Sequence, residues 1–505
     1  MNKITNAKSL MQHLAQVGLD DQILVMCHGV FDVVHPGHLE HFRRAKELGS
    51  LLVVSVTSDE FVNKGPGRPK FSLEQRMLFL SSLEIIDYVI PSFSPSAIEN
   101  IKLIKPAIYA KGDDYLQIEA DKTGKMVKEK LEVEKWGGKV FFTSGFRSSS
   151  TTLINTYLSP LDETGQKWLS ELKNKLTYEE ICKYLDSLNQ LKMTLLGEFI
   201  LDEYTFCTAL SKSSKDPILA FHKLETEEYL GGIFAIADNC KRWCQKIEVV
   251  FPHGNLNSKI LSLLDSRFSK SEILDIVDGD IQSIIKHRFV DKSSNQRVFE
   301  FYDFDPKPVS TKTSKKILQV LNQQKDADDI VLVADYGHGL FTNELIEQIT
   351  KIDLFLAINT QANAGNRGFN TISKYSRADF ISLNGGELQL ELRSKSLDYF
   401  KVVPEIMKKM RSRHSLLTLG SEGLMVFDDS GNSSKVPALS KVVVDKVGAG
   451  DSVFAVATLL SKINAPIEVI GLVASIVAAN EISQLGHRSG LELEDIKRNI
   501  KNLFG

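Results

Sequence analysis

The stretch Gly29-Val30-Phe31-Asp32-Val33-Val34-His35-Pro36-Gly37-His38 decides how the N-terminal part of this chain folds. An apolar run, residues 23–27, comes just before it, and a run of that length bounded by glycine predicts a buried strand of a parallel sheet. The residues after it, 39–48, have helical character, and Gly49 is a plausible stop. The stretch is therefore expected to join a strand to a helix.

The residue types in this connection point to phosphate chemistry. His35 and His38 stand three positions apart at the mouth of the helix. Pro36 is tolerated in a first helical turn, and Gly37 lets another backbone or a phosphate approach closely. Free amides, the positive end of the helix dipole and two imidazoles make a site for a polyanion. The alternative, two surface histidines on a loop, does not account for the strand before them and the amphipathic helix after them.

Length and composition limit the class of protein. A chain of 505 residues is too long for one ordinary core, so two or three domains are expected. With 43% hydrophobic residues, 25% charged residues and a formal net charge of −3, the chain has no electrostatic footprint for nucleic acid or an anionic membrane. There is no apolar signal region and no apolar run approaching ~18 residues. We therefore expect a cytoplasmic protein with reduced thiols, since the five cysteines form neither an even framework nor a metal-binding spacing.

Further strands and loops follow in the first 155 residues. Strands are expected over residues 51–56, 87–91, 106–110 and 140–142. A basic loop, residues 63–70, leads into another helix, and a serine and threonine cluster, residues 148–152, is expected at a helix N-terminus. A strand–helix–strand unit with its motif at the end of the first strand is where doubly wound sheets bind ligands.

The quoted stretch resembles the signature of the HxGH nucleotidyltransferases, the cytidylyltransferase-like family. AKELGSLLVVSVTSDEF (45–61), EQR (74–76), KGDDY (111–115) and SSSTT (148–152) also look like blocks of that family, so the resemblance covers residues 22–155. It implies that both histidines hold a nucleoside triphosphate while a substrate phosphate attacks its α-phosphorus and pyrophosphate leaves.

The resemblance assigns catalysis to His35 and His38, and assigns nucleotide contacts to Gly29, Phe31, Lys64, Arg68, Arg76, Asp113, Ser150 and Thr151. In this assignment Lys64 or Arg68 neutralises charge at the transferring phosphate, which is where most of the catalysis is expected. Alternatives remain. Arg76 could be a surface helix residue, Lys64 a solvated lysine, and the 148–152 cluster a simple helix cap. Asp113 and Asp114 could hold Mg²⁺ or a ribose, or form a turn.

A polar, helix-prone segment, residues 156–190, separates the first domain from a second. Thr177-Tyr178-Glu179-Glu180 has the spacing of a capping box, so a helix is expected to begin there. Further on, apolar strands near residues 193–197, 329–335, 380–384 and 416–420 alternate with helical patterns. The predicted fold class is α/β, with two doubly wound parallel-sheet domains, 1–155 and 191–505, joined by the helical linker.

The chemistry of the second domain lies in Asp445-Lys446-Val447-Gly448-Ala449-Gly450-Asp451, which precedes an apolar helix. Glycines just before a helix present amides to an anion, so they can stabilise a transferring γ-phosphate. Asp451 is placed to take the proton from an attacking hydroxyl. A Gly-Ala-Gly run alone fits a tight turn equally well.

With Asn384-x-x-Glu387 and the Asp335 turn upstream, this motif resembles the PfkB (ribokinase-like) sugar kinases over residues 193–500. The resemblance implies that Asp451 is the general base, that Gly448, Ala449 and Gly450 form the anion hole, and that Glu387 organises Mg²⁺ and phosphate. It places Asp202, Gly231, Gly232 and Asp335 at the sugar, and Asn384, Thr418, Gly420 and Gly423, with the region of Asn480, at the nucleotide.

Two segments depart from the pattern of that family. Gly231-Gly232-Ile233-Phe234-Ala235 replaces Gly-Gly-x-x-Asn, which suggests a different sugar or impaired sugar binding. Asn359-Thr360-Gln361-Ala362-Asn363 replaces an Asp-Pro-Lys-like strand end, so phosphate handling there is in question. Lys286, His287, Arg288 and Arg367 fit a substrate phosphate and a solvated basic face equally well.

Together the halves resemble the bifunctional heptose 7-phosphate kinase/heptose 1-phosphate adenylyltransferases, with the order of the halves reversed. The resemblance implies an enzyme that makes an NDP-activated, heptose-like sugar for surface polysaccharide, with ATP in the kinase half, ATP or CTP in the transferase half, and Mg²⁺. The expected partners are a sugar or sugar phosphate and nucleotides, and we expect a homo-oligomer, a dimer. One alternative is a nucleotidyltransferase whose kinase-like half only binds sugar as a regulatory module. Another is a cytidylyltransferase for a polyol phosphate with an independent kinase.

Overall fold

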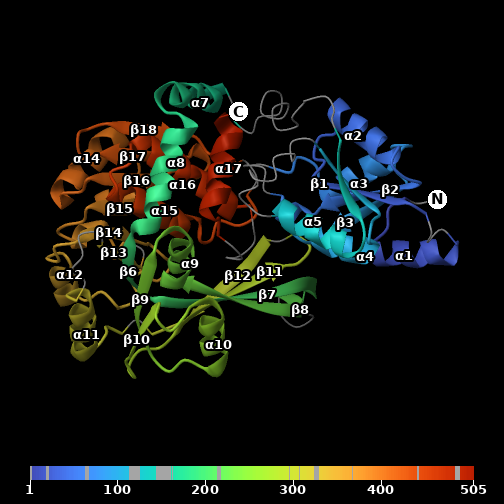
Figure 1. Ribbon diagram of the computed structural model, residues 1–505. Coiled ribbons are helices and arrows are strands. Elements are labelled where there is room, and N and C mark those ends of the chain that lie inside the picture. The colour runs from blue at the N-terminus through green and yellow to red at the C-terminus, as the bar shows by residue number, and fades with distance from the viewer. Residues whose placement is uncertain are drawn as a thin grey trace. The chain divides into compact units, whose positions relative to one another are not determined.

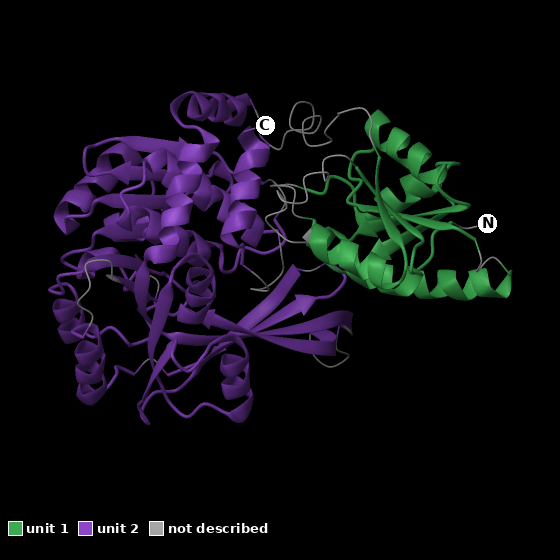
Figure 2. Cartoon of the chain, in the orientation of Figure 1, with its two compact units in different colours: residues 1–160, 505 green, residues 161–504 purple. Residues whose placement is uncertain are grey.

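The structure of the chain is a computed structural model that describes residues 3–18, 22–62, 68–112, 125–143, 161, 163–212, 218–294, 296–305, 307–323, 329–366, 368–440, 443–483 and 490–504. The chain divides into two units, residues 1–160 with 505 and residues 161–504 (Figure 2). The α/β class predicted from the sequence is confirmed. Each unit is described by itself.

The first unit contains a parallel sheet of five strands within its described residues, in the order β3-β2-β1-β4-β5. The strands are β1 (Leu24–Gly29), β2 (Leu51–Thr57), β3 (Tyr88–Ser92), β4 (Ile108–Gly112) and β5 (Lys139–Thr143). The chain runs outward from β1 to β3 and then returns to the other side of β1 with β4. The point where the order reverses, between β1 and β4, is where open α/β sheets bind ligands at the carboxyl ends of their strands.

Helices cover both faces of this sheet (Figure 1). They are α1 (Ala7–Gln16), α2 (Pro36–Lys46), α3 (Leu73–Ser81), α4 (Ile98–Ile104) and α5 (Lys125–Lys135). Side chains along β1 alternate between the two cores, since Val25 and Cys27 pack on the side of α2 and α3, and Leu24 and Met26 on the side of α1 and α4. A strand buried on both faces reads as a continuous apolar run, which is why residues 23–27 were informative.

The main sheet of the second unit contains nine strands within the described residues, in the order β10-β9-β6-β13-β14-β15-β16-β17-β18. They are β6 (Lys192–Gly197), β9 (Lys246–His253), β10 (Ile273–Val277), β13 (Asp329–Asp335), β14 (Phe355–Thr360), β15 (Phe380–Asn384), β16 (His414–Thr418), β17 (Leu424–Asp428) and β18 (Ser433–Val436). All pairs are parallel as far as β16, and β17 and β18 add an antiparallel edge.

Two layers of helices enclose the main sheet of the second unit. One face carries α9 (Ile233–Trp243), α10 (Ser258–Arg267), α15 (Ala449–Lys462), α16 (Ile467–Glu481) and α17 (Leu493–Phe504). The other carries α11 (Thr311–Leu321), α12 (Asn343–Ile349), α13 (Gly385–Leu392) and α14 (Tyr399–Met410). α15 and α16 are apolar on nearly all sides because they are buried together, which is the pattern expected of a core helix.

A separate four-stranded sheet, which the sequence did not predict, stands out from this unit in Figure 1. It contains, among the described residues, β7 (Phe199–Lys212), β8 (Leu219–Gly232), β11 (Ile284–Asp291) and β12 (Gln296–Asp303), in the order β12-β11-β7-β8. β7 pairs antiparallel with β8 and parallel with β11. Asp202 and Lys286 are register partners, so their side chains lie on the same face.

The segment predicted as a linker, residues 156–190, contains α7 (Glu163–Lys175), α8 (Tyr178–Ser187) and the 3₁₀ turn η4 (Leu188–Gln190) among its described residues. The capping box at Thr177 is present, with Glu180 as its reciprocal partner. Leu172, Ile181 and Leu185 are buried in the core of the second unit. These helices are therefore part of that unit.

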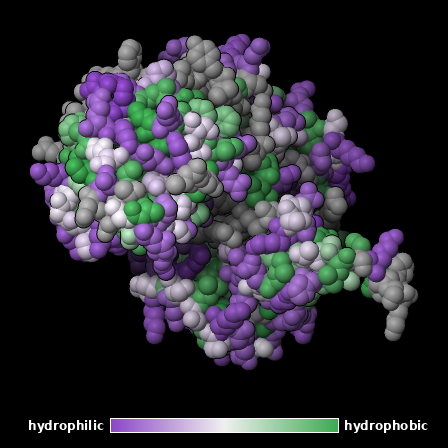
Figure 3. Space-filling view, turned by 90° about the vertical axis from the view of Figure 1, so that its right-hand side faces the viewer, coloured by the Kyte–Doolittle hydropathy of each residue, from purple (hydrophilic) through white to green (hydrophobic). Residues whose placement is uncertain are grey.

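Hydrophilic and hydrophobic side chains are interspersed on the face shown in Figure 3. Within the described ranges, no helix has the length and apolar character needed to cross a bilayer.

Candidate functional site

The two histidines of the first unit meet at the N-terminus of α2, next to the carboxyl end of β1. His35 is the N-cap residue, and its Nδ1 accepts a hydrogen bond from the Gly37 amide at 3.2 Å. The rings of His35 and His38 lie with their centroids 3.9 Å apart. Because Nδ1 of His35 is the acceptor, its Nε2 carries the proton and can donate. The structure thus brings together the imidazoles and helix amides that the sequence predicted.

Phe31 and Gly29 shape the floor beneath these histidines. Phe31 is buried, adopts a left-handed backbone with φ +51°, and packs edge-on against His38 with centroids 5.4 Å apart. A methyl group on Gly29 would lie 2.9 Å from the Phe31 ring, so only glycine leaves room for the ring there. Their predicted nucleotide contacts remain a prediction, and their observed contacts support the position of His38.

Asp32 ties the histidine loop to the basic loop. Its carboxylate accepts a hydrogen bond from Arg68 Nε at 2.6 Å and from the amides of Lys70 and Phe71 at 2.6 and 3.0 Å. The Asp32 and Arg68 side chains are only 1% and 3% exposed. Nη2 of Arg68 is buried and has no hydrogen-bond partner within the described residues. Arg68 therefore keeps a donor that a phosphate oxygen could use.

Lys70 is a further cation beside Arg68 that the sequence analysis did not single out. Burial, together with the neighbouring Arg68, lowers the pKa of the Lys70 amine, and Asp32 opposes this shift. No described residue forms an ion pair with the Lys70 amine. The only signal for it in the sequence was its place at the end of the basic loop.

Arg76 is buried, which excludes the alternative of an ordinary surface helix residue. Its guanidinium donates to the carbonyls of Val30, Phe71 and Thr57, and also to the Asp59 carboxylate. Val30 lies just after β1, Thr57 and Asp59 lie at and just after the end of β2, and Phe71 lies just before α3. In this geometry Arg76 holds the two strand ends together, and a role in supporting the nucleotide would act through the loops.

Four predicted nucleotide ligands, Lys64, Asp113, Ser150 and Thr151, lie outside the described residues. Their assignments stay predictions.

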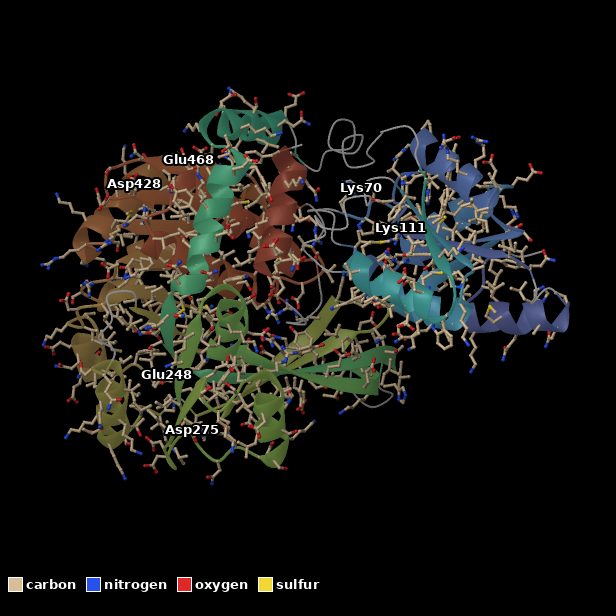
Figure 4. The ribbon with its side chains drawn as sticks, in the orientation of Figure 1. Lys70, Lys111, Glu248, Asp275, Asp428 and Glu468 are labelled. Carbon is tan, nitrogen blue, oxygen red and sulfur yellow. The ribbon has the colours of Figure 1, made fainter. Side chains whose placement is uncertain are left out.

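A buried polar network flanks the switch point on the other face of the sheet. Lys111, labelled in Figure 4, lies 3.3 Å from Glu129, which also accepts from Tyr109 OH and from the Ala97 amide at 2.9 Å each. Burial opposes ionisation of Glu129, but Lys111 and these donors outweigh it and lower its pKa. Lys111 is the next-to-last residue of β4 and the first of the KGDDY block, whereas Glu129 carried no sequence signal because its partners are distant in the chain.

In the second unit, the predicted anion hole forms the N-terminus of α15. Gly448 is the N-cap residue with φ +83°, a left-handed conformation that favours glycine. A methyl group added to Gly450 would meet no described atom within 4 Å, so the space beside this turn is open. Ala449 begins the helix, and Asp451 stands in its first turn. The turn thus presents helix amides and a carboxylate side by side.

Asp451 is held by residues from the ends of two adjacent strands. Its Oδ1 accepts a hydrogen bond from Gln361 Nε2 at 2.6 Å and from Tyr336 OH at 3.2 Å. Lys286 and Glu387 are close enough for electrostatic interaction with it. Burial lowers the pKa of Lys286, against the opposing effects of Asp202 and Asp451.

Glu387 and Asn384 form a reciprocal capping box at the start of α13. Glu387 accepts from the Asn384 amide at 2.8 Å and from the Ala362 amide at 3.3 Å, one bond on each carboxylate oxygen. Burial raises the pKa of Glu387 to about 7, although these amides act in the opposite direction. Asn384 is paired in register with Thr418 of β16, and Gly420 and Gly423 form the positive-φ turn that follows. The structure therefore gathers the predicted nucleotide residues of this unit at neighbouring strand ends.

The predicted sugar residues lie where β7 and β8 meet α9. A methyl group on Gly231 would lie 2.3 Å from Asp202 Oδ2, and one on Gly232 would lie 2.4 Å from the Glu198 carbonyl. Asp202 is largely buried and ion-paired with Arg288. Ile233 and Phe234 are fully buried in the core, and Ala235 nearly so. The glycine pair thus brings two backbones and the Asp202 carboxylate into close contact.

Asp335 is brought to the same edge of the sheet, but protein groups engage its carboxylate. Tyr375 OH donates to it at 2.7 Å, the Gly337 amide donates at 3.0 Å, and Lys374 forms an ion pair with it. Its neighbour Glu198, which the sequence analysis did not assign, accepts from the amides of Tyr336 and His338. Burial and the adjacent Asp335 raise the pKa of Glu198 to about 7.

Asp445 connects the four-stranded sheet to the turn before α15. Its buried carboxylate accepts from Arg297 of β12 at 2.6 Å, from Tyr204 OH of β7 at 3.1 Å and from the Val447 amide at 3.1 Å. The contact fixes the residues that lead into Gly448. Arg367, offered by the sequence as a phosphate ligand, is outside the described residues, and His287 is paired with Glu203 at 2.8 Å.

No group of three or more histidine, cysteine, aspartate or glutamate side chains in the described ranges is placed to hold a metal ion.

Comparison with known proteins matches the two units to two families. The cytidylyltransferase-like family matches residues 26–156, and the pfkB family of carbohydrate kinases matches residues 234–493. Among curated proteins, the bifunctional protein HldE of Blochmanniella pennsylvanica is 37% identical over 114 residues, which is 22% of this chain and 24% of that protein. HldE of Syntrophotalea carbinolica is 34% identical over 155 residues, 30% of each chain. The chain thus spans less than a third of the length of these curated relatives.

Among solved structures, phosphofructokinase-2 from Escherichia coli in complex with potassium matches with a TM-score of 0.51 and 16% identity. The match covers 62% of this chain and 99% of that one. At this level of identity the similarity shows the fold alone.

Proposed function

Because the chain belongs to the pfkB family of carbohydrate kinases and also carries a cytidylyltransferase-like unit, we propose that it is a bifunctional enzyme. The second unit phosphorylates a hydroxyl of a sugar or sugar phosphate with ATP. The first unit then joins the resulting sugar phosphate to a nucleotide from ATP or CTP. The product is an NDP-activated, heptose-like sugar for surface polysaccharide, made in the cytoplasm by a homo-oligomer, a dimer.

One observation carries this proposal. The paired histidines at the start of α2 and the aspartate at the start of α15 belong to a single chain. The first arrangement suits a reaction that consumes a sugar phosphate, and the second suits a reaction that makes one. The presence of both sites in one chain supports, by analogy, two consecutive reaction steps.

In the kinase step, the sugar hydroxyl gives its proton to Asp451, and its oxygen attacks the γ-phosphorus of ATP. The bond from the γ-phosphorus to the bridging oxygen breaks, and ADP leaves. The amides at Gly448, Ala449 and Gly450 stabilise charge on the transferring group, since they lie at the positive end of α15. Asp202 orients the sugar, and Asn384, Thr418, Gly420 and Gly423 lie on the side assigned to the nucleotide.

In the transferase step, a phosphate oxygen of the sugar phosphate attacks the α-phosphorus of the nucleoside triphosphate, and pyrophosphate leaves. His35, through Nε2, His38 and the α2 amides stabilise the negative charge that develops on the leaving group. Arg68 and Lys70 supply positive charge from the basic loop. Arg76 keeps the strand ends in place.

Mg²⁺ would accompany the nucleotide phosphates in both steps and neutralise part of their charge. Each carboxylate oxygen of Glu387 accepts one backbone amide and keeps a further lone pair, so Glu387 would organise the ion either directly or through a water molecule. Mg²⁺ usually keeps several waters and binds proteins through few carboxylates.

A second candidate function is a nucleotidyltransferase whose kinase-like unit only senses a sugar. Ala235 is nearly fully buried in the first turn of α9, where the family pattern has asparagine, so this turn offers the sugar no polar side chain at that position. A polyol phosphate such as glycerol phosphate is the alternative substrate of the transferase unit, with CTP as the nucleotide.

The test measures ADP formation and pyrophosphate release separately in wild type, Asp451→Ala and His35→Ala. Pentoses, hexoses, heptoses and their phosphates are supplied with ATP, and sugar 1-phosphates and glycerol phosphate with ATP or CTP. Asp429→Ala and His13→Ala serve as matched controls in the same units. We expect Asp451→Ala to abolish ADP formation while pyrophosphate release from a supplied sugar 1-phosphate continues, and His35→Ala to lower pyrophosphate release by about 10²–10³.

The outcomes separate the two functions. If wild type fails to form ADP with every sugar supplied, but a sugar increases pyrophosphate release, the second unit is a sensor. If neither product forms with any substrate pair, the bifunctional proposal is wrong.

A further inference from the structure

Two uncharged donors converge on one oxygen of Asp451. Gln361 Nε2 is 2.6 Å from Oδ1 and Tyr336 OH is 3.2 Å from the same atom. Tyr336 directly follows β13 and Gln361 directly follows β14, and these strands are parallel neighbours in register. Both donors therefore reach the carboxylate from adjacent positions at the same edge of the sheet.

Three asparagines hold the backbones of these two donors. We call Asn363, Asn366 and Asn370 the amide clamp. Asn366 Nδ2 donates to the Tyr336 carbonyl at 2.6 Å and to the Gln361 carbonyl at 3.2 Å, so one side chain ties the two residues to each other. Asn363 Nδ2 also donates to the Tyr336 carbonyl, at 2.7 Å. Asn370 Nδ2 donates to the Gln361 carbonyl at 3.1 Å.

The surroundings make these bonds strong and specific. Asn366, Asn370 and Tyr336 are buried, and a hydrogen bond in a medium of low dielectric is stronger than one in water. Gly337 has φ +71°, and a methyl group on it would lie 2.2 Å from Asn366 Nδ2. Only glycine therefore lets Asn366 reach both carbonyls.

A purely structural role for the amide clamp would explain why the Tyr336 and Gln361 carbonyls are hydrogen-bonded. It would not explain why the side chains of these two residues both reach Asp451. If the clamp only capped a loop, the Gln361 amide and the Tyr336 hydroxyl would have no reason to share one carboxylate oxygen. Their shared acceptor is the proposed base, on a third element, α15. The contacts thus form a chain from the clamp through two donors to Asp451.

We propose that Gln361 and Tyr336 are positioning residues that fix the plane of the Asp451 carboxylate, and that the amide clamp holds both donors in place. The inference rests on the proposed kinase function of this unit. When the sugar hydroxyl passes its proton to Asp451 and its oxygen bonds to the γ-phosphorus, the carboxylate must not rotate. A base held in one orientation needs no reorganisation during the reaction.

The choice of a neutral donor follows from the same chemistry. A cation at position 361 would stabilise the ionised carboxylate more than an amide does, and so weaken Asp451 as a base. Glutamine keeps the geometric constraint without a full charge. The departure at residues 359–363 thus exchanges a charged side chain for an orienting one.

The kinetic test compares Gln361→Leu, Tyr336→Phe and Asn366→Ala with wild type. Gln282→Leu is the matched control, because Gln282 also donates an amide to a carboxylate, Asp303, at 2.8 Å in an exposed position. We expect Gln361→Leu to lower kcat about 10- to 100-fold, with the KM for sugar and ATP changed less than about threefold. Asn366→Ala should lower kcat in the same way, and should lower it less in Gln361→Leu than in wild type, because part of the effect of Asn366 on Asp451 passes through Gln361.

The pH profile of kcat distinguishes a positioning role from a purely structural one, because a purely structural role would leave the profile unchanged. Lys286, Glu387 and Tyr336 are charged or titratable groups that interact with Asp451. All three remain in Gln361→Leu, so an upward shift of its acidic limb reports the lost donor. A rise in KM with kcat unchanged, or additive losses in the double variant, overturns the proposal.

A spectroscopic test decides the contact independently of turnover. In protein labelled with ¹⁵N-glutamine, the side-chain amide signal of Gln361 should move in Asp451→Asn, while the signal of Gln282 stays in place. If the Gln361 signal does not move in Asp451→Asn, the positioning contact is refuted. Absence of ADP formation by wild type with every sugar refutes the kinase function instead, so the two failures are distinguishable.

Discussion

The Asp32–Arg68 pair makes a sharp prediction for the first unit. Asp32→Asn keeps the shape of the side chain but removes its charge. The carboxylate accepts three hydrogen bonds, from Arg68 Nε at 2.6 Å and from the amides of Lys70 and Phe71. Asparagine offers one oxygen, and its NH₂ group would face a donor. The substitution therefore leaves the guanidinium of a buried arginine without its countercharge.

The size of the effect follows from burial. Both side chains are at most 3% exposed, so solvent does not screen the pair. Removing one partner of such a pair costs about 3–5 kcal/mol, and we take about 3 kcal/mol because asparagine keeps one acceptor. At 1.36 kcal/mol for each factor of ten, this corresponds to a loss of roughly 100-fold in the equilibrium constant for folding of the first unit.

The assay is native-state hydrogen exchange followed by mass spectrometry, because it reports each unit separately within the whole chain. Peptides from β1 and β4 open only with the core of the first unit, so their protection should fall about 100-fold. Peptides from β13 and β14 are an internal control. Glu99→Gln is the matched variant, since Glu99 pairs with Lys102 at 2.7 Å on the exposed surface and its loss should leave the protection of these peptides nearly unchanged. A loss of protection below threefold in Asp32→Asn would refute this reasoning.

The remaining predictions concern the second unit. Burial raises the pKa of Glu387 from 4.5 to about 7, so its stabilising contribution is complete below pH 4.5 and is lost as the pH rises through 7. Glu387→Gln should therefore lessen the decline in unfolding free energy between pH 5 and pH 8 by about 2–3 kcal/mol, measured by urea denaturation at both pH values. Gly231→Ala displaces the Asp202 carboxylate and should raise the KM for sugar at least about 10-fold. Gly232→Ala, with φ +59° and a backbone carbonyl 2.4 Å away, should instead destabilise the unit, as thermal unfolding would show. Arg297→Met removes the guanidinium from its ion pair with the buried Asp445 carboxylate and should cost about 1–3 kcal/mol, because Arg297 is 34% exposed and the pair is partly screened. Arg297→Lys should recover part of that loss in the same denaturation assay.

The fold of the first unit could be predicted from the sequence because its signals are local. β1 and β2 are buried on both faces, so each appears as an unbroken apolar run, and the helix after Pro36 follows within a few residues. Strand β8, in the four-stranded sheet of the second unit, gave no such signal. β8 carries Glu225, Glu227 and Glu228 along its middle, and most of its residues are partly or fully exposed. Without a buried face, a strand has no alternation of apolar and polar residues to detect.

The site residues also divide into those with a local sequence signal and those without one. His35, His38 and Asp451 stand in short motifs whose helix termini are visible in the sequence. Glu129, Glu198 and Lys70 matter through contacts with residues that no local pattern identifies. The resemblance to the PfkB kinases placed Asp335 at the sugar, but the sequence could not show that Tyr375, 40 residues away, donates to it.

Gln361 shows why a departure from a family pattern does not by itself indicate a lost activity. The glutamine was conspicuous in the sequence because a lysine-like residue was expected there, and the simplest inference was impaired phosphate handling. Its hydrogen-bond partner, Asp451, is 90 residues further along the chain. A side chain that loses one contact and gains another looks the same in a sequence as one that only loses a contact. The two cases differ in what the side-chain donor contacts, and here the Gln361 amide donates to Asp451, the group proposed to accept the proton. If that contact positions the base, Gln361→Lys should lower kcat rather than raise it, because an added positive charge would make Asp451 a weaker base.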